Sequence, residues 1–144
     1  MKIEINEGFP EIGVVINCSE VSDEVRKIET VLRYHDKKVV GVRNGQTHLI
    51  DRHDVLYFES VDKRCFIYTS DETYETSLKL YETEEDISEP CFFRSSKSQV
   101  INIMKIVSLC PDFDGRIEAT MENGEKLIVS RQYAKLLKER LGLK

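Results

Sequence analysis

The sequence predicts a mainly β protein with short helices, an α+β fold, and three observations support it. A chain of 144 residues is long enough to bury one core and leaves little room for a second. From Lys38 onward, short apolar runs alternate with turn residues, which is typical of sheet proteins. Only a few segments carry the i, i+3, i+4 spacing of an amphipathic helix. We therefore expect one domain of small antiparallel sheets, preceded by an extension.

The extension, residues 1–37, is predicted to be acidic and to contain a strand and a helix. The run GVVIN at residues 13–17 favours a short strand, and a helix is expected from about Ser19 to Tyr34, with Ser19 as its N-cap. One face of this helix carries an apolar stripe: Val21, Val25, Ile28 and Leu32. Such a stripe packs on the sheet or forms an interface with a partner.

Residues 38–144 are predicted to form the main domain, which begins with hairpins. The strands expected in its first half are 38–43, 47–50, 54–59, 65–69 and 73–76. Asn44 and Gly45 separate the first two, and this pair favours the positive φ angles of a two-residue hairpin turn. Residues 60–64 are expected to join the third strand to the fourth.

The second half is expected to continue with short helices and strands. Ser77 is a predicted N-cap for a helix through Asp86, and Pro90 marks a break after it. Further strands are expected at 103–109, 116–121 and 126–130, with Asn123 and Gly124 forming the turn between the last two. A terminal helix is predicted from about Gln132. Its apolar side carries Tyr133, Leu136, Leu137 and Leu141.

Composition excludes several classes of protein. No apolar run is long enough to span a bilayer, and the carboxylates in the first 18 residues argue against a signal peptide, so we expect a cytoplasmic protein without membrane insertion. The four cysteines lack the spacing of metal knuckles or disulfide frameworks and are expected to be reduced core thiols. The histidines also lack ligand spacing. No metal or cofactor is predicted.

Charge is unevenly distributed along the chain, whose net charge is −5. Residues 1–36 carry a net −4 and residues 71–90 a net −7, whereas residues 37–70 carry +2 and residues 91–144 carry +4. A basic surface is therefore compatible with the acidic total. The acidic run from Glu82 to Glu89 is interpreted as a solvated helix face, because it lacks the turn residues of a calcium site.

No motif of an enzyme is present: the sequence has no G-x-S-x-G, no Gly-rich loop before a helix and no H-E-x-x-H. Cations instead occur in three expected loops. These loops contain Lys63 with Arg64, Arg94 with Lys97, and Arg131 with Gln132. Such side chains can contact phosphates and base edges, although exposed cations in turns are also common in proteins that bind no nucleic acid.

The order of several segments resembles the LytTR DNA-binding domain family of bacterial transcriptional regulators, the LytR and AlgR type. The matching segments are Asp54 to Glu59 (DVLYFE), Ser77–Leu78, Phe93–Arg94 through Lys97–Ser98 to Val100–Asn102, Asn123–Gly124, and Leu127 to Arg131 (LIVSR) with Tyr133. Their order is specific, although no single motif is decisive. The resemblance covers roughly residues 38–144, whereas the receiver domain of many members has no counterpart here.

The resemblance implies an elongated fold of small antiparallel sheets whose strand-connecting loops enter successive grooves of promoter repeats. Arg64, Lys97 and Arg131 are the implied base contacts. The implied phosphate contacts are Lys63, Arg94, Ser95, Ser98 and Gln132. Family members commonly have a histidine and an aromatic residue where this chain has Ser96 and Gln99, which affects the expected sequence preference.

The implied partners are double-stranded DNA, a second copy of the chain as a homodimer on DNA, and a membrane-bound inhibitory protein. An alternative hypothesis is a protein-protein interaction module that uses the acidic surface and the N-terminal helix. Within residues 91–102 (CFFRSSKSQVIN), the apolar residues at both ends are expected to anchor a polar middle in the core. Arg94 has a second possible role there, bracing the loop through backbone carbonyls, and ranks below Lys97 as a DNA contact.

Overall fold

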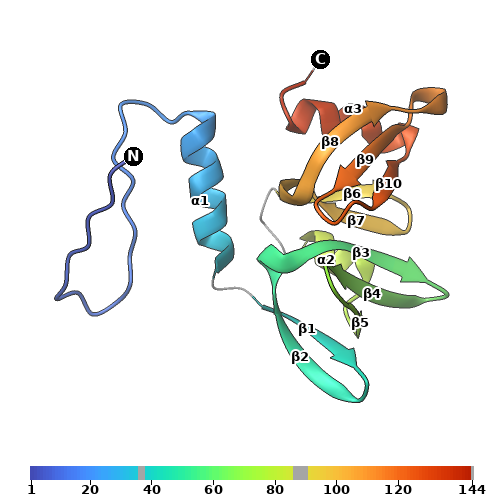
Figure 1. The fold of residues 1–144 in the computed structure, drawn as a ribbon, viewed down its shortest axis with the longest axis horizontal. Coiled ribbons are helices and arrows are strands. Elements are labelled where there is room, and N and C mark those ends of the chain that lie inside the picture. Colours follow the sequence, from blue (N-terminus) through green and yellow to red (C-terminus); the bar gives the residue numbers. More distant parts are fainter. Residues whose placement is uncertain (36–37, 86–90, 144) are drawn as a thin grey trace.

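Two antiparallel sheets form the body of the structure, a computed structural model that describes residues 1–35, 38–85 and 91–143 (Figure 1). Their strand orders are β2-β1-β5-β4-β3-β7-β6 and β10-β9-β8. The strands are β1 Lys38–Arg43, β2 Gln46–Asp51, β3 Val55–Val61, β4 Arg64–Thr69, β5 Thr73–Thr76, β6 Phe92–Ser96, β7 Gln99–Asn102, β8 Ile106–Pro111, β9 Ile117–Met121 and β10 Lys126–Val129. The predicted mainly β, α+β fold class is therefore confirmed.

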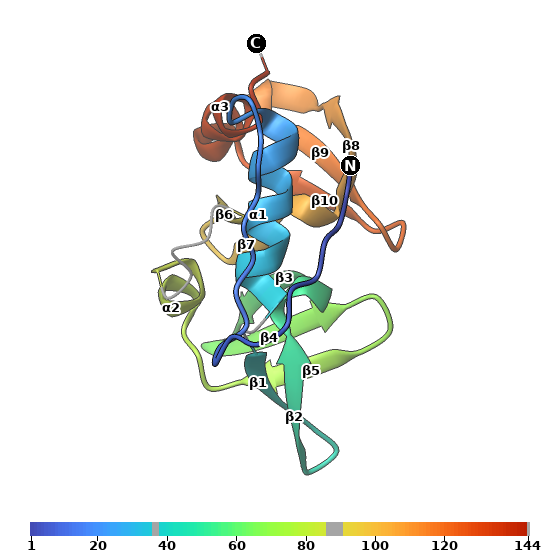
Figure 2. The ribbon, with the colours of Figure 1, turned by 90° about the vertical axis from the view of Figure 1, so that its left-hand side faces the viewer.

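Helices occupy the margins of these sheets. They are α1 Asp23–His35, α2 Leu80–Glu85 and α3 Arg131–Arg140, with three 3-10 turns, η1 Arg52–Asp54, η2 Ile103–Lys105 and η3 Phe113–Gly115. Helix α2 contacts β3, β6 and β7, and α3 contacts β6. Helix α1 contacts η1 and stands beside the sheets with residues 1–22 (Figures 1 and 2). None of the described helices is long and apolar enough to cross a membrane.

Two short turns set the register of the first hairpins. Asn44 (φ 52°) and Gly45 (φ 74°) both have positive φ, which confirms the predicted two-residue turn between β1 and β2. Asp62 (φ 50°) and Lys63 (φ 66°) adopt the same geometry between β3 and β4. The expected five-residue connection is thus a two-residue turn, and Arg64 is the first residue of β4 rather than part of the turn.

The body has two hydrophobic clusters that share strands β3 and β7. Phe58 and Val100 belong to the cluster under α2, whereas Leu56 and Ile101 belong to the cluster under α3. All four side chains are fully buried. Strands buried on both faces have continuous apolar runs, which accounts for the sequences VLYF and VI at these positions. The two sheets therefore form one body around this shared central pair.

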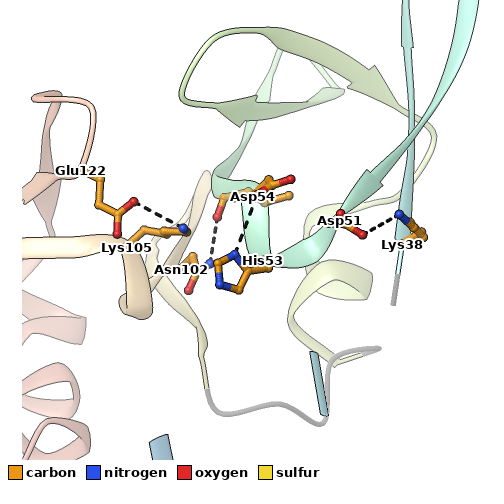
Figure 3. Close-up of polar contacts among 8 residues, drawn as sticks. Lys38, Asp51, His53, Asp54, Asn102, Lys105 and Glu122 are labelled. Carbon is orange, nitrogen blue, oxygen red and sulfur yellow. Dashed lines mark hydrogen bonds and ion pairs between the residues drawn. The ribbon is translucent and has the colours of Figure 1, made fainter. Parts of the chain in front are cut away.

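Polar contacts also hold the segment after β7 that links the two sheets. Asn102 donates from Nδ2 to the backbone oxygen of Val55 (2.9 Å), and its Oδ1 accepts from the N–H of Met104 (3.0 Å) to cap η2. Figure 3 shows the first of these contacts and the ion pair of Lys105 with Glu122, in which Nζ and Oε2 are 3.4 Å apart. These bonds fix the chain where it passes from one sheet to the other.

A hydrogen bond from Tyr57 makes a second connection between the sheets. Its hydroxyl donates to Oε2 of Glu125 at 2.7 Å, and its ring stacks on that of Tyr68 with centroids 4.3 Å apart. Burial, and then the hydrogen bond to Glu125, raise the pKa of Tyr57 above its ordinary value. Tyr57 therefore remains a protonated donor to Glu125.

The N-terminal extension differs from its prediction. Residues 13–17 form no strand, because no other strand of the described chain pairs with them. Helix α1 begins at Asp23, and Ser22 rather than Ser19 precedes it and accepts from the N–H of Val25 at 3.3 Å. Val21 consequently lies outside the helix. Residues 36 and 37, at the expected domain boundary, lie outside the described residues.

Only part of the predicted stripe of α1 is shielded from solvent. Val25 and Ile28 are half-buried, whereas Val21 and Leu32 are exposed. Toward its C-terminal half the helix borders a cavity of about 120 Å³, lined in part by Thr30, Val31, His53 and Met104. A cavity of this size is well below the roughly 300–1,000 Å³ of ordinary small-molecule sites.

Three other expectations need correction. Helix α2 begins at Leu80, and Ser77 is not its N-cap; the predicted end at Asp86, the break at Pro90 and most of the acidic run lie outside the described residues. Helix α3 buries Ala134 and Leu137, whereas Leu136 is exposed. Of the four free cysteines, Cys65 and Cys91 are buried as expected, but Cys18 and Cys110 are exposed.

Candidate nucleic-acid interface

The polar middle of residues 91–102 is a tight hairpin turn rather than a loop. Strands β6 and β7 meet at Lys97 and Ser98, which are both exposed. The apolar ends of the segment are buried, as predicted: Phe92, Phe93, Val100 and Ile101. Lys97 and Ser98 are therefore presented at the tip of a hairpin whose base is anchored in both hydrophobic clusters.

Arg94 braces this turn from the inside. Its Nε donates to the backbone oxygen of Ser96 at 2.7 Å, and its Nη2 donates to that of Lys97 at 2.6 Å. The alternative role predicted for Arg94, bracing through backbone carbonyls, is thus confirmed. A guanidinium engaged in this way holds the turn in shape.

Ser95 does not lie on the surface. Its side chain is fully buried, and its single O–H is shared between two acceptors on Gln99, the backbone oxygen and Oε1, each 3.1 Å from Oγ. In this geometry the hydroxyl is shielded from solvent and engaged with Gln99, so the structure lends no support to a phosphate contact by Ser95. No pattern in the sequence indicated that Ser95 would be hydrogen-bonded to Gln99, which is also buried.

The β3–β4 turn exposes Lys63 to solvent, whereas Arg64, the next residue, is hydrogen-bonded to Glu75. The Nε and Nη2 atoms of Arg64 donate to Oε1 and Oε2 of Glu75 at 2.8 and 2.6 Å. The hydrogen bond and the charge of Glu75 raise the pKa of Arg64, and the hydrogen bond from Arg64 lowers that of Glu75. Arg64 therefore lies near the turn, but any DNA atom must compete with Glu75 for it.

The third element is the start of α3. Ser130 precedes the helix, and Arg131 and Gln132, its first two residues, are exposed. The side chain of Arg131 passes over Gly115 of η3, where an added Cβ would be 3.1 Å from Cγ of Arg131. The first backbone N–H groups of a helix lack intrahelical acceptors, and the helix dipole favours anions there.

Two backbone hydrogen bonds bring these three elements together. The N–H of Ser60, near the β3–β4 turn, donates to the oxygen of Ser98 at 2.8 Å. The N–H of Ser130 donates to the oxygen of Ser95 at 2.9 Å. The β6–β7 hairpin is thus bonded on one side to β3 and on the other to the start of α3. Lys63, Lys97 and Arg131 therefore belong to three neighbouring elements.

Two of these elements, the hairpin turns, point away from the N-terminal residues. The β3–β4 and β6–β7 turns point to the right-hand side of Figure 1, whereas α1 and residues 1–22 lie on the left. In Figure 2, which views the molecule from that left-hand side, α1 and residues 1–22 lie in front of the sheets. The two turns are therefore uncovered by the extension.

Comparison with known proteins agrees with this arrangement. The family model described as the LytTr DNA-binding domain matches residues 45–142. A solved LytTr DNA-binding domain from Bacillus cereus superposes with a TM-score of 0.71 at 25% identity, covering 75% of this chain and 99% of that one. An uncharacterized HTH-type transcriptional regulator of Staphylococcus aureus (strain NCTC 8325 / PS 47) is 29% identical, covering 99% of this chain and 98% of the relative. Its counterpart in strain MRSA252 is 28% identical.

The arrangement of helices distinguishes this chain from a helix-turn-helix protein. Within the described ranges, five strands separate α1 from α2, and five more separate α2 from α3. No two of these helices are consecutive, so the cations lie on hairpin turns and at a helix start instead of on a recognition helix. The family and the relatives together support a DNA-binding regulator of transcription. With its match over residues 45–142, this chain belongs to the LytTR family of DNA-binding domains.

Proposed function

We propose that this protein regulates transcription by placing three elements, the β3–β4 turn, the β6–β7 turn and the start of α3, in successive grooves of promoter DNA. The observation that carries the proposal is the pair of backbone hydrogen bonds, Ser60 to Ser98 and Ser130 to Ser95, that joins the three elements. Each of them presents an exposed cation to solvent. One rigid surface can therefore meet several parts of a duplex at once.

The geometry favours a revised division of roles within this surface. Lys97 and Arg131 are the proposed base contacts, because both are exposed and neither has an acidic partner among the described residues. The proposed phosphate contacts are Lys63, Ser98 and Gln132. Arg64 contacts DNA only if it exchanges Glu75 for a base or phosphate. Arg94 shapes the turn, and Ser95 supports it from within.

Charge placement supports the same surface. The described part of the extension, residues 1–35, contains 7 carboxylate residues and 4 lysines or arginines, and it lies on the side away from the turns (Figure 1). Its negative charge is therefore separated from the proposed DNA surface. Over distances beyond a Debye length of about 8 Å at physiological salt, repulsion of this kind is largely screened.

The decisive experiment compares promoter and random duplexes. In gel shifts, Arg131→Ala is expected to weaken promoter binding by about 1–3 kcal/mol, because a bidentate base contact is lost, and to change random-duplex binding far less. Lys138→Ala, in the last turn of the same helix, is the matched control and should leave both affinities unchanged. Equal loss on both duplexes would remove Arg131 from base readout, and absence of any shift at low salt would refute DNA binding by this surface.

Partner proteins form the second part of the proposal. The exposed apolar residues of the extension favour a protein-binding role beside the DNA-binding one. We propose that the protein binds DNA repeats as a homodimer. A membrane-bound inhibitory protein is a second proposed partner, and it would bind the acidic surface and α1. Co-purification of the full chain with such a protein, abolished by Leu32→Glu but not by Lys97→Ala, would favour the second candidate.

A further inference from the structure

Residues 1–22, here called the arm, expose apolar side chains to an unusual degree. Ile12 is 100% exposed and Val15 is 82% exposed. The other exposed large apolar residues of the arm are Met1, Ile3, Ile5, Phe9, Val14 and Val21. In Figure 1 the arm folds back on itself beside α1 and stands apart from both sheets. Exposed apolar side chains gathered in one segment favour an interface.

One part of the arm has the composition of a strand. Residues 12–19 (IGVVINCS) contain no charged residue, no proline and four β-branched apolar residues, and Glu11 and Glu20 bound the run. Such a run favours β-structure, but a strand forms only when its backbone groups pair with another strand. The described part of this chain provides no such partner. A strand at residues 12–19 would therefore need a partner beyond the pairings of the described residues.

Charge and symmetry favour a second copy of this chain as the partner. We propose that residues 12–19 pair with the same residues of a second copy of this chain, as antiparallel strands related by a two-fold axis at Val15. In this register Val14 lies opposite Ile16 of the second copy, Glu11 lies opposite Ser19, and Glu20 lies opposite Pro10. Because no like charges face each other, the run is complementary to itself.

The position of the arm is compatible with this dimer. The arm lies on the side of the body away from the β3–β4 and β6–β7 turns, so pairing leaves both proposed DNA surfaces open (Figures 1 and 2). The Staphylococcus aureus relative aligns over 99% of this chain, a span that includes the arm. This pairing gives a structural basis for the homodimer proposed above. Only its consequence for DNA binding rests on the proposed function.

Cysteine crosslinking tests the pairing directly, with DNA absent. Val14→Cys, Val15→Cys and Ile16→Cys are each placed in the full chain carrying Cys18→Ser and Cys110→Ser, which removes the two exposed natural thiols. Facing residues of antiparallel strands have Cα atoms about 4.5–5.5 Å apart, within the range of a disulfide. Oxidation should give the largest yield of covalent dimer at Val15→Cys. Ile5→Cys, which is also exposed but lies outside the run, is the matched control and should crosslink little.

A second measurement separates the dimer from DNA binding. Val15→Glu places two carboxylates opposite each other and should raise the dimer dissociation constant at least about a hundredfold in sedimentation equilibrium, whereas Ile5→Glu should not. Val15→Glu should still bind a DNA fragment with a single site, while Arg131→Ala should remain dimeric. A monomeric natural chain, or equal crosslinking at Val15→Cys and Ile5→Cys, would overturn the inference without affecting the proposed DNA contacts.

Discussion

Val15 of the arm and Val55 of strand β3 are the same residue type in similar apolar runs, yet Val15 is 82% exposed and Val55 is fully buried. The difference lies in their neighbours. Strand β3 pairs with β4 on one side and β7 on the other, whereas residues 12–19 have no partner in the described chain. The strand-forming tendency of a sequence thus becomes structure only where backbone partners exist.

The largest contrast between the two regions is expected in thiol reactivity. Burial raises the pKa of Cys65 from its ordinary value of 9.0 to about 11, whereas Cys18 is exposed on the arm. Iodoacetamide at pH 8, followed by peptide mass spectrometry, should label Cys18 at least about a thousandfold faster, because Cys65 reacts only through rare unfolding. Similar rates at the two positions would show that the sheet opens locally at β4.

The same pKa shift gives a pH dependence with a definite sign. Because the folded protein holds the Cys65 proton more tightly than the unfolded chain, stability is unaffected by this group below about pH 9. As the pH rises from 9.0 toward about 11, the unfolded chain ionises first and this thiol lowers the free energy of unfolding. Cys65→Ala should remove that part of the decline in urea titrations.

Truncation of a large side chain should distinguish the regions next most strongly. Phe58→Ala removes a fully buried ring from the cluster under α2 and should lower the free energy of unfolding by about 3–5 kcal/mol. Ile5→Ala, in the arm, should change it by less than about 0.5 kcal/mol because Ile5 is exposed. Urea denaturation followed by circular dichroism compares them. A cost for Ile5→Ala comparable to that of Phe58→Ala would mean that the arm packs on the body.

Alanine substitutions at two glycines are expected to differ in stability by an intermediate amount. At Gly41 of β1, an added Cβ would lie 2.7 Å from Cβ of Tyr74 and 2.9 Å from Cδ1 of Ile50. Gly41→Ala should therefore destabilise the fold by about 1–3 kcal/mol through overpacking. Nothing lies within 4 Å at Gly13 of the arm, and Gly13→Ala should be close to neutral. Equal melting temperatures for the two variants would contradict the close packing of β1 on β5.

The smallest effect is expected on α1. Arg33 and Glu29 form an i, i+4 ion pair at 3.0 Å, with side chains 69% and 50% exposed. An exposed helix pair contributes about 0.3–0.5 kcal/mol and is weakened by salt. Arg33→Ala should thus lower the unfolding free energy by no more than that, and the loss should vanish at 1 M salt. A larger, salt-resistant loss would place Arg33 in a contact with the body.

Local chemistry explains which elements were predictable. Asn44 and Gly45 favour positive φ by themselves, so the first hairpin could be placed from the sequence. Asp62 and Lys63 adopt the same turn without a glycine, because the pairing of β3 with β4 imposes it. The predicted strand at residues 13–17 is absent because sequence pattern shows a tendency and not the presence of a neighbour.

In the candidate site, too, some features could be predicted from local sequence and others depend on neighbouring residues. Exposed cations near turns could be identified from composition and from the family resemblance, and Lys63, Lys97 and Arg131 are indeed exposed. The burial of Ser95 and the engagement of Arg64 depend on Gln99 and Glu75, and no local pattern indicates those pairings. Whether the exposed cations contact DNA stays a prediction.

The brace at the β6–β7 turn also bears on how DNA preference can change over time. Arg94 holds the carbonyl oxygens of Ser96 and Lys97, which every amino acid possesses. Replacing the side chain at position 97 therefore leaves both bonds of the brace available and the turn in the same shape. Under the proposed role of Lys97, a single substitution at the tip would alter the contact with DNA without any compensating change in the fold.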